Sequence, residues 1–400
     1  MKKILFVALG ATLLAAGCQK TEIVNPVNPT GKTPMSFSTE IAKLTKSAVG
    51  TGIENLQDQG FKLSAVIAYE DIYTTDTEFN TNYDGLSNKQ FTYDKAANKW
   101  EIEGGQSYFW PGTGKELVFF AVSSAKDAVA VPTIAANGFG ISGTKDDATG
   151  AYTGVGVSNY KITDYVVTAP TYAKTATGEI AVGTQTGADD DLMIAEVVIR
   201  HQSEPSAGNN NGEVDLMFNH TLSKVQFVFT TNSTTASTYP VTVKSVVIED
   251  VINKATLNVE VESDLTTKRT SNNTYDWSPE ENTVLYALTP NEGNTTDFTI
   301  DYDLTLNGSQ DGQIYATWLV IPQTLTNKMV SVTYTIGDAA NTTATPKEFT
   351  SVWPLYTTTL TAWERNQYIK YTVNLSPNMI TFKPSVETDW AVGGSSSLNN

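Results

Sequence analysis

The chain has 400 residues, a formal net charge of −17 and a single cysteine, Cys18. An acidic surface of this kind repels phosphate backbones, so we expect no nucleic-acid partner. One cysteine cannot form an internal disulfide or a cysteine-ligated zinc site. At roughly 100–200 residues per domain, the length predicts two or three domains.

The N-terminus has the pattern of an exported lipoprotein. Lys2 and Lys3 precede an apolar run over residues 4–16, which is too short to span a bilayer comfortably. The small residues of Leu-Ala-Ala-Gly then lead into Cys18. We therefore expect residues 1–17 to be a signal peptide and Cys18 to carry lipid, which anchors the chain to the outer membrane at the cell surface. The alternative is a plain secretory signal in which Cys18 is incidental.

Residues 18–33 are polar and contain proline, as expected for a tether between lipid and body. Beyond them, apolar and polar residues alternate with period two, and the apolar residues are mostly β-branched or aromatic. Helical periodicity nowhere exceeds about two turns. The pattern predicts an all-β fold of sandwiches or barrels, and it is clearest at Val225–Phe229, Leu257–Val261, Phe298–Leu306, Val330–Ile336 and Ile369–Leu375.

The polar, Gly- and Asn-rich residues 200–213 are the predicted domain boundary. We expect an N-terminal β-sandwich domain over residues 34–205 and a C-terminal one over residues 206–400. Residues 136–160 are rich in Gly, Asp and Thr and are interpreted as a long surface loop or an insertion inside the first domain.

Residues able to support catalysis or metal binding are few. His201 and His220 have no metal-ligand spacing, and each is interpreted as structural or solvent-facing. Asp189–Asp191 could bind calcium through carboxylate oxygens, but successive residues on extended backbone point to opposite faces, so a solvated acidic turn is favoured. Paired carboxylates for glycoside hydrolysis stay open, because nothing selects a pair. We expect no enzyme, no metal site and no cofactor.

Several tryptophans could form a sugar-stacking platform or belong to sandwich cores, and the core interpretation is favoured. They are Trp110, Trp277, Trp353, Trp363 and Trp390.

Several segments together resemble the fimbrillin family, the pilin-like lipoproteins of Bacteroidota. Their order runs from the lipidation motif to the C-terminus, which makes the joint match specific. The segments are FWPGT at 109–113, LVFFA at 117–121, DLMIA at 191–195, FNHTLSKV at 218–225, IPQTL at 321–325, and YTVNL, ITFKPSV and TDW within 363–390.

The resemblance implies two tandem transthyretin-like β-sandwich domains and a structural role. The protein would be a stalk or anchor subunit of a surface fimbria or pilus with a role in adhesion. Its partners would be other pilin subunits, joined by donor-strand exchange after a trypsin-like protease has cut each subunit.

The resemblance also implies roles for particular residues. Residues 34–41 would form a first strand that is displaced after cleavage, and its inward-facing residues would be Met35, Phe37, Thr39 and Ile41. The candidate cleavage sites are Lys46 and Lys43. Family members often carry Arg at this place, so the protease here must accept Lys. The alternative is a basic loop with no processing role.

The candidate donor is the C-terminal tail, residues 366–400. Its first run has Ile369, Tyr371, Val373 and Leu375 on one face, and Ile380 and Phe382 begin a second run after Pro377. The same alternation fits an ordinary final strand of the C-terminal domain.

The alternative function is a glycan-binding surface lipoprotein of a polysaccharide-uptake system. Tethered sandwiches with aromatic platforms suit that role as well.

Overall fold

The computed structural model describes residues 34–41, 53–69, 81–82, 86–110, 116–125, 141–145, 152–157, 160–171, 190–200, 213–262, 272–278, 294–309, 311–376 and 380–387. Most of these residues lie in strands, which confirms the all-β class. The helices among them are short: α1 (Ile53–Gln59), the 3-10 helix η1 (Glu103–Gly105) and α2 (Ser233–Thr238).

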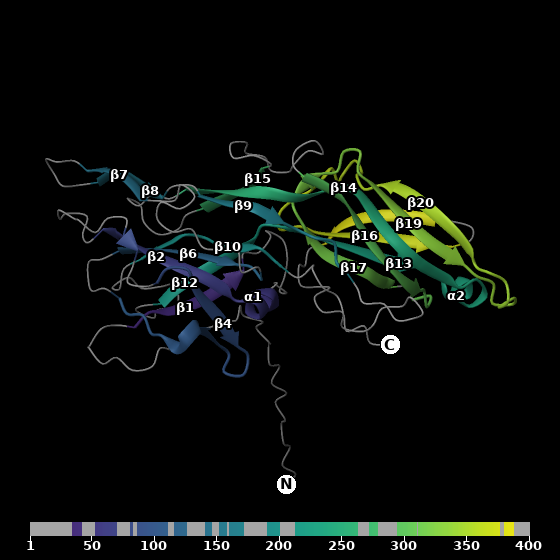
Figure 1. Ribbon diagram of the computed structural model, residues 1–400, viewed down its shortest axis with the longest axis horizontal. Coiled ribbons are helices and arrows are strands. Elements are labelled where there is room, and N and C mark those ends of the chain that lie inside the picture. The colour runs from purple at the N-terminus through teal and green to yellow at the C-terminus, as the bar shows by residue number, and fades with distance from the viewer. Residues whose placement is uncertain are drawn as a thin grey trace, which may run out of the picture.

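A nine-stranded sheet, called the N-terminal sheet below, occupies one end of the molecule (Figure 1). Its order is β1 (Ser36–Ile41), β12 (Glu213–His220), β10 (Met193–Ala195), β6 (Glu116–Ser123), β2 (Phe61–Tyr69), β4 (Lys89–Asp94) and β5 (Lys99–Ile102). Two short strands join this path, β11 (Val198–Arg200) beside β6 and β3 (Thr81–Asn82) beside β2.

Two further sheets form the other end of the molecule (Figure 1). The four-stranded sheet has the order β17 (Gln313–Val320), β13 (Ser223–Thr230), β22 (Tyr368–Leu375) and β23 (Ile380–Glu387). The six-stranded sheet has the order β15 (Asn272–Ser278), β14 (Val241–Glu262), β19 (Met329–Ile336) and β20 (Lys347–Pro354), with β16 (Asn294–Thr305) and β9 (Tyr160–Val166) also beside β14. These strands confirm the clearest alternating runs of the sequence.

Two small sheets complete the described structure. They pair β18 (Gln323–Thr324) with β21 (Ala362–Trp363), and β7 (Ile141–Lys145) with β8 (Tyr152–Val157). The β7–β8 hairpin shows that residues 136–160 are not a loop throughout, while the alternative of an insertion inside the first domain stays a prediction. Ladder hydrogen bonds come from the backbone, so a segment rich in Gly and Thr can pair without an apolar face.

Strand β6 lies between two hydrophobic cores because its side chains alternate between two faces. Leu117, Phe119 and Ala121 join the core of the N-terminal sheet. Val118 and Phe120 join the larger core that contains the four- and six-stranded sheets. The two ends of the molecule are therefore packed against each other through apolar side chains.

The long strand β14 also links the two halves of the chain. Its first part pairs with β16 and β19, and its second part pairs with β15 and with β9, which comes from the N-terminal half. The expected domain boundary lies in residues 201–212, outside the described residues. Because β12 follows it and pairs in the N-terminal sheet, that sheet takes strands from both sides of residues 201–212. The number of domains stays a prediction.

In the described part of the chain, no helix is long and apolar enough to cross a membrane.

Candidate assembly site

Among the described strands, β1 is the terminal strand of the N-terminal sheet and pairs, in parallel, only with β12. The register places Ser36 opposite Glu213 and Ile41 opposite Phe218. The start of the strand is held by the amide of Met35, which donates to the carbonyl of Tyr108 at 2.9 Å. Edge strands of this kind carry unpaired backbone groups on one side.

The inward face of β1 is fully inserted into the core. Met35 and Phe37 are 0% exposed, Thr39 is 1% exposed and Ile41 is 9% exposed. These are the four residues that the family resemblance placed on the inward face of the first strand. We call the place taken by residues 35–41 beside β12 the β1 site.

The core contacts of β1 reach across to the opposite strands of the sheet. The ring of Phe37 packs edge-on against Phe91 of β4 and Phe119 of β6, with centroids 5.2 and 5.9 Å apart. Trp100 of β5 donates from Nε1 to Oγ1 of Thr39 at 3.0 Å. Strands β4, β5 and β6 thus contact the inward face of β1. This one edge strand completes the core of the N-terminal sheet.

The other face of β1 carries a polar contact. Ser38 donates a hydrogen bond to the carboxylate of Asp215 on β12, and its own side chain is buried. Sequence reasoning did not single out Asp215, because only the pairing of β1 with β12 brings the two residues together.

The candidate cleavage sites Lys43 and Lys46 and the candidate lipidation site Cys18 lie outside the described residues. The described chain stops at Ile41 and resumes at Ile53, the first residue of α1.

The two runs of the candidate donor tail differ in their position in the sheet and in the burial of their side chains. Strand β22 is an interior strand, parallel to β13 and antiparallel to β23. Its four apolar residues, Ile369, Tyr371, Val373 and Leu375, are all 0% exposed. The Tyr371 hydroxyl accepts from Nε1 of Trp363 at 2.9 Å. Strand β22 is therefore an integral part of its own core.

Strand β23 is the edge of the four-stranded sheet and is only partly covered. Ile380 and Phe382 are half-buried, and the Phe382 ring stacks between Trp353 and Tyr371 with centroids 5.4 and 5.3 Å apart. Val386 is 50% exposed.

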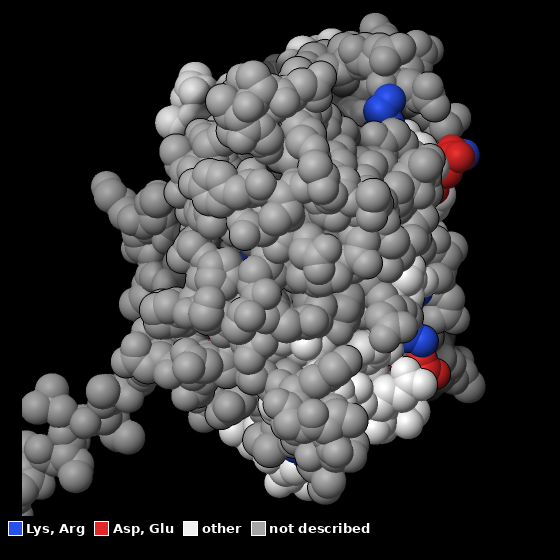
Figure 2. Space-filling view, turned by 90° about the vertical axis from the view of Figure 1, so that its left-hand side faces the viewer, with Lys and Arg blue, Asp and Glu red and all other residues white. Residues whose placement is uncertain are grey.

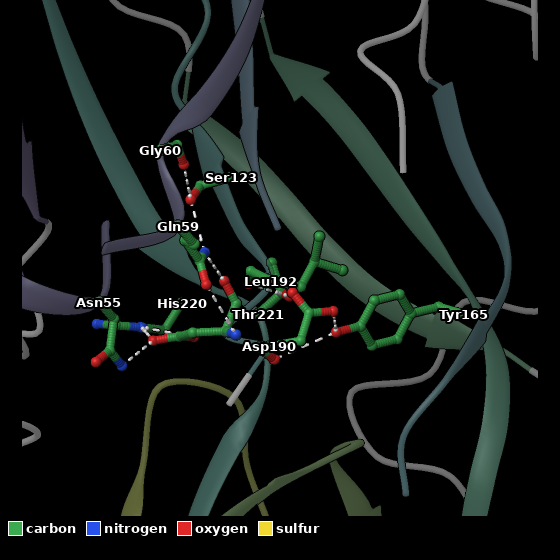
Figure 3. Close-up of polar contacts among 10 residues, drawn as sticks. Asn55, Gln59, Gly60, Ser123, Tyr165, Asp190, Leu192, His220 and Thr221 are labelled. Atoms are coloured by element: carbon green, nitrogen blue, oxygen red, sulfur yellow. Dashed lines mark hydrogen bonds and ion pairs between the residues drawn. The ribbon is translucent and has the colours of Figure 1, made fainter. Parts of the chain in front are cut away.

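A buried polar network fastens α1 and the end of β12 beside the β1 site (Figure 3). Nδ1 of His220 lies 2.9 Å from Oδ2 of Asp191. Asn55 of α1 donates to the same carboxylate at 3.1 Å, and Gln59 donates to the Asp191 carbonyl at 2.6 Å. Gln59 also donates to Ser123 Oγ at 2.6 Å, so α1 is bonded both to β6 and to the residue Asp191 that precedes β10.

Asp191 is 0% exposed, so the expectation of a solvated acidic turn is wrong for this residue. His220 supplies the partner that compensates its burial, and the two lie 29 residues apart in sequence. Burial raises the pKa of the Asp191 carboxyl, but the charge and hydrogen bond of His220 outweigh it and hold that pKa below its ordinary value.

The neighbouring carboxylate points the other way, as extended backbone requires. Asp190 accepts from the Tyr165 hydroxyl at 2.6 Å (Figure 3). It also accepts from Ser124 Oγ at 2.7 Å. Tyr165 belongs to β9 of the six-stranded sheet, so Asp190 and Asp191 bond to different sheets. Asp189 lies outside the described residues, and the question of calcium there stays open; elsewhere in the described chain no three His, Cys, Asp or Glu residues form a metal-ligand group.

The tryptophans mostly serve the cores. Trp110 is 1% exposed and Trp363 is 0% exposed, which confirms the core interpretation for both. Trp353 is partly buried beneath Phe382. The side chains of Trp277 and Trp390 are not among those described.

Charged side chains of both signs occur together at the end of the molecule seen in Figure 2. The basic and acidic side chains visible there lie beside one another along one edge. Such pairs near the N-terminal sheet include Lys95 with Asp58, and Lys99 with Glu101 at 2.8 Å.

Solved structures similar to this chain include several fimbrial proteins. A Bacteroides uniformis protein is 15% identical with a TM-score of 0.42, covering 90% of this chain and 99% of its own. A fimbrial protein from Bacteroides vulgatus is 14% identical with a TM-score of 0.40, covering 88% and 98%. The tip fimbrial protein Mfa3 from Porphyromonas gingivalis is 9% identical with a TM-score of 0.33, covering 84% and 96%.

No curated protein matches the chain significantly in sequence. The family model described as fimbrillin-like matches residues 68–390, a range that includes β22 and β23 and begins after β1. The match spans most of the 400 residues, and the chain therefore belongs to the fimbrillin-like family.

Proposed function

We propose that the protein is a structural subunit, stalk or anchor, of a surface fimbria that serves adhesion and polymerises by protease-triggered donor-strand exchange. Membership of the fimbrillin-like family supports the fimbrial role. The observation that carries the assembly mechanism is β1, a lone edge strand whose inward side chains complete a core. Such a subunit needs neither a catalytic residue nor a cofactor.

The position of β1 makes it replaceable. It is joined to the rest of the chain through residues 42–52, which contain Lys43 and Lys46. A trypsin-like protease that cuts after either lysine leaves β1 held by its ladder with β12, by the backbone bond from Met35 to Tyr108 and by its side-chain contacts. Helix α1 follows the cut and keeps its bonds to Asp191 and Ser123.

Loss of β1 would create a strong acceptor for another strand. Each ladder hydrogen bond contributes about 1 kcal/mol net. Each large apolar side chain that leaves the core forfeits roughly 1.5–3 kcal/mol, and Met35, Phe37 and Ile41 are three such side chains. The exposed edge of β12 and the vacated core then favour pairing with an extended segment of another subunit.

The C-terminal tail of a second subunit is the proposed donor. Because the acceptor and the donor lie at different places on the subunit, the contact is heterologous and produces an open filament. The lipid proposed for Cys18 holds the subunit at the outer membrane before the cut, and the cut releases it.

The test is brief digestion of the purified protein with a low dose of trypsin, followed by SDS gels without boiling and N-terminal sequencing. We expect new N-termini at Leu44 or Ser47 and a ladder of SDS-resistant oligomers. The matched control is the Lys43→Gln/Lys46→Gln variant, which should stay intact and monomeric. A wild-type protein that is cut at either lysine and remains monomeric overturns the proposal.

A further inference from the structure

The structure assigns a particular strand and register to the intersubunit contact: β23 of a second copy occupies the β1 site, with Phe382 at the position of Phe37 and Lys383 opposite Asp215. The inference rests on the proposed function and specifies it further. It follows from the burial of the tail strands, from the side-chain pattern of β23, and from the polar face of the β1 site.

The burial of the two tail strands selects β23 over β22. Withdrawing β22 would remove Tyr371 and Val373, both 0% exposed, from the core and break ladders on both of its sides. Withdrawing β23 breaks one ladder and takes the partly buried Phe382 from its place between Trp353 and Tyr371. An edge strand with partly exposed side chains leaves at far lower cost than a central strand.

The apolar side chains of β23 recur at the spacing of those on β1. Residues 35–41 read Met-Ser-Phe-Ser-Thr-Glu-Ile, and residues 380–386 read Ile-Thr-Phe-Lys-Pro-Ser-Val. Keeping the parallel direction of β1, this register puts Ile380, Phe382 and Val386 at the inward positions of Met35, Phe37 and Ile41. A shift by two residues keeps the same face inward but removes the phenylalanine from its place between Phe91 and Phe119.

Burial supplies the driving force for this exchange. In its own subunit, Val386 is 50% exposed and Phe382 is half-buried. In the β1 site the corresponding positions, those of Ile41 and Phe37, are 9% and 0% exposed. Moving the strand to a neighbour therefore buries the exposed parts of these two side chains at about 25 cal/mol per Å². Part of that gain is offset because the rings of Trp353 and Tyr371 lose the cover of Phe382.

The polar face of the β1 site favours Lys383 at the position opposite Asp215. Ser38 is 1% exposed and donates to Asp215, so the side chain at this position needs a polar partner. Lys383 is exposed in its own subunit. In the proposed register its ammonium group faces the Asp215 carboxylate, and a close pair of opposite charges sets the register more sharply than an apolar face alone.

One position does not match. Pro384 falls at the place of Thr39, so Trp100 Nε1 would lose the acceptor that it has in the intact subunit. The absence of an amide hydrogen on proline is tolerated on an edge strand. Pro384→Thr would restore the acceptor and should make the oligomers more resistant to SDS.

The test is disulfide trapping between two singly substituted chains. Cys18 is the only cysteine, so chains carrying Cys18→Ser contain the introduced thiol alone. Full-length Asp215→Cys protein is mixed with Lys383→Cys protein, cut briefly with trypsin and oxidised. The matched controls replace Lys383→Cys by Thr381→Cys or Ser385→Cys, which lie on the same face of β23, two residues away on either side.

We expect a strong intermolecular disulfide with position 383 and little with positions 381 or 385. Ladders that form while trapping favours 381 or 385 overturn the register and leave the proposed function intact. Ladders trapped at none of the three positions overturn the assignment to β23. If cut protein forms no ladder at all, with or without the substitutions, the proposed function itself fails.

A charge swap tests the role of Lys383 separately. Lys383→Glu should lower the yield of ladders by about tenfold or more, because facing like charges cost several kcal/mol. The double variant Lys383→Glu/Asp215→Lys should recover much of that loss. Equal yields from the single and double variants would contradict the ion pair. Lys347→Glu, a charge reversal on the exposed strand β20, is the control and should leave the yield unchanged.

Discussion

Nδ1 of His220 lies 2.9 Å from Oδ2 of Asp191, and both side chains are at most 1% exposed. His220 ends β12, the strand against which β1 pairs, and Asp191 precedes β10, the next strand of the sheet. The pair therefore links β12, the partner strand of β1, to the rest of the N-terminal sheet. The same carboxylate holds Asn55 of α1, the first described element after the candidate cleavage sites.

This buried pair predicts a component of acid sensitivity. The pKa of Asp191 is lowered in the folded protein, so its contribution to stability is complete above the ordinary aspartate pKa of 3.8. That contribution is lost as pH falls from there through the lowered pKa, because folding then has to release a proton. Urea unfolding midpoints measured from neutral to acid pH should fall in this range.

The Asp191→Asn variant should lose about 3–5 kcal/mol at neutral pH, since it breaks a buried pair. Its unfolding midpoint should also depend less on pH in the acid range. Asp58→Asn is the control, because Asp58 lies on the exposed side of α1 and pairs with Lys95 at the surface. Identical pH profiles for wild type and Asp191→Asn would contradict the assigned role.

Gly60 is predicted to be intolerant of any side chain. It follows α1 with a φ of +72°, and its amide donates to the Leu56 carbonyl at 2.9 Å. A Cβ there would lie 2.3 Å from the carbonyl oxygen of Phe91. Gly60→Ala should therefore destabilise the protein by about 2 kcal/mol or more, from the backbone conformation and the clash together. Gly104→Ala, at a φ of +81° with open space around it, isolates the conformational part.

The contrast between the two tail strands predicts different costs for the same substitution. Val373 on β22 is 0% exposed, and Val386 on the neighbouring β23 is 50% exposed. Val373→Ala should lower the free energy of unfolding by about 2 kcal/mol, whereas Val386→Ala should stay within about 0.5 kcal/mol. Chemical denaturation of the intact monomer measures both. Equal costs would mean that β23 is as firmly integrated as β22.

Phe37 is predicted to decide how firmly β1 is seated. Phe37→Ala removes a ring that packs on Phe91 and Phe119, at a cost of about 3–5 kcal/mol. Hydrogen exchange should then accelerate in β1 and β12 and stay slow in β13 and β22, because the latter belong to a different core. Glu40→Ala, on the less buried face of β1, is the control. Uniform acceleration across the chain would indicate global rather than local loosening.

Much of the local structure could be read from the residues. The alternation at Phe298–Leu306 and Ile369–Leu375 predicted strands that the structure contains, because a half-buried strand must present one apolar face. The inward positions of Met35, Phe37, Thr39 and Ile41, which the family resemblance implied, follow the same period of two.

The sequence by itself thus determined the fold class, the inward face of each clear strand and the motifs that resemble a family. Only the tertiary structure decided which strands are neighbours: β1 beside β12, β9 beside β14, and Asp191 beside His220. The physical reason is that period-two alternation records only that one face of a strand is buried. Edge strands and interior strands both have such a face, so the pattern does not tell them apart. Pairing between strands depends on backbone N–H and C=O groups, and every residue type has both except proline, which lacks the N–H. The choice of partner strand therefore leaves little trace in the local sequence pattern.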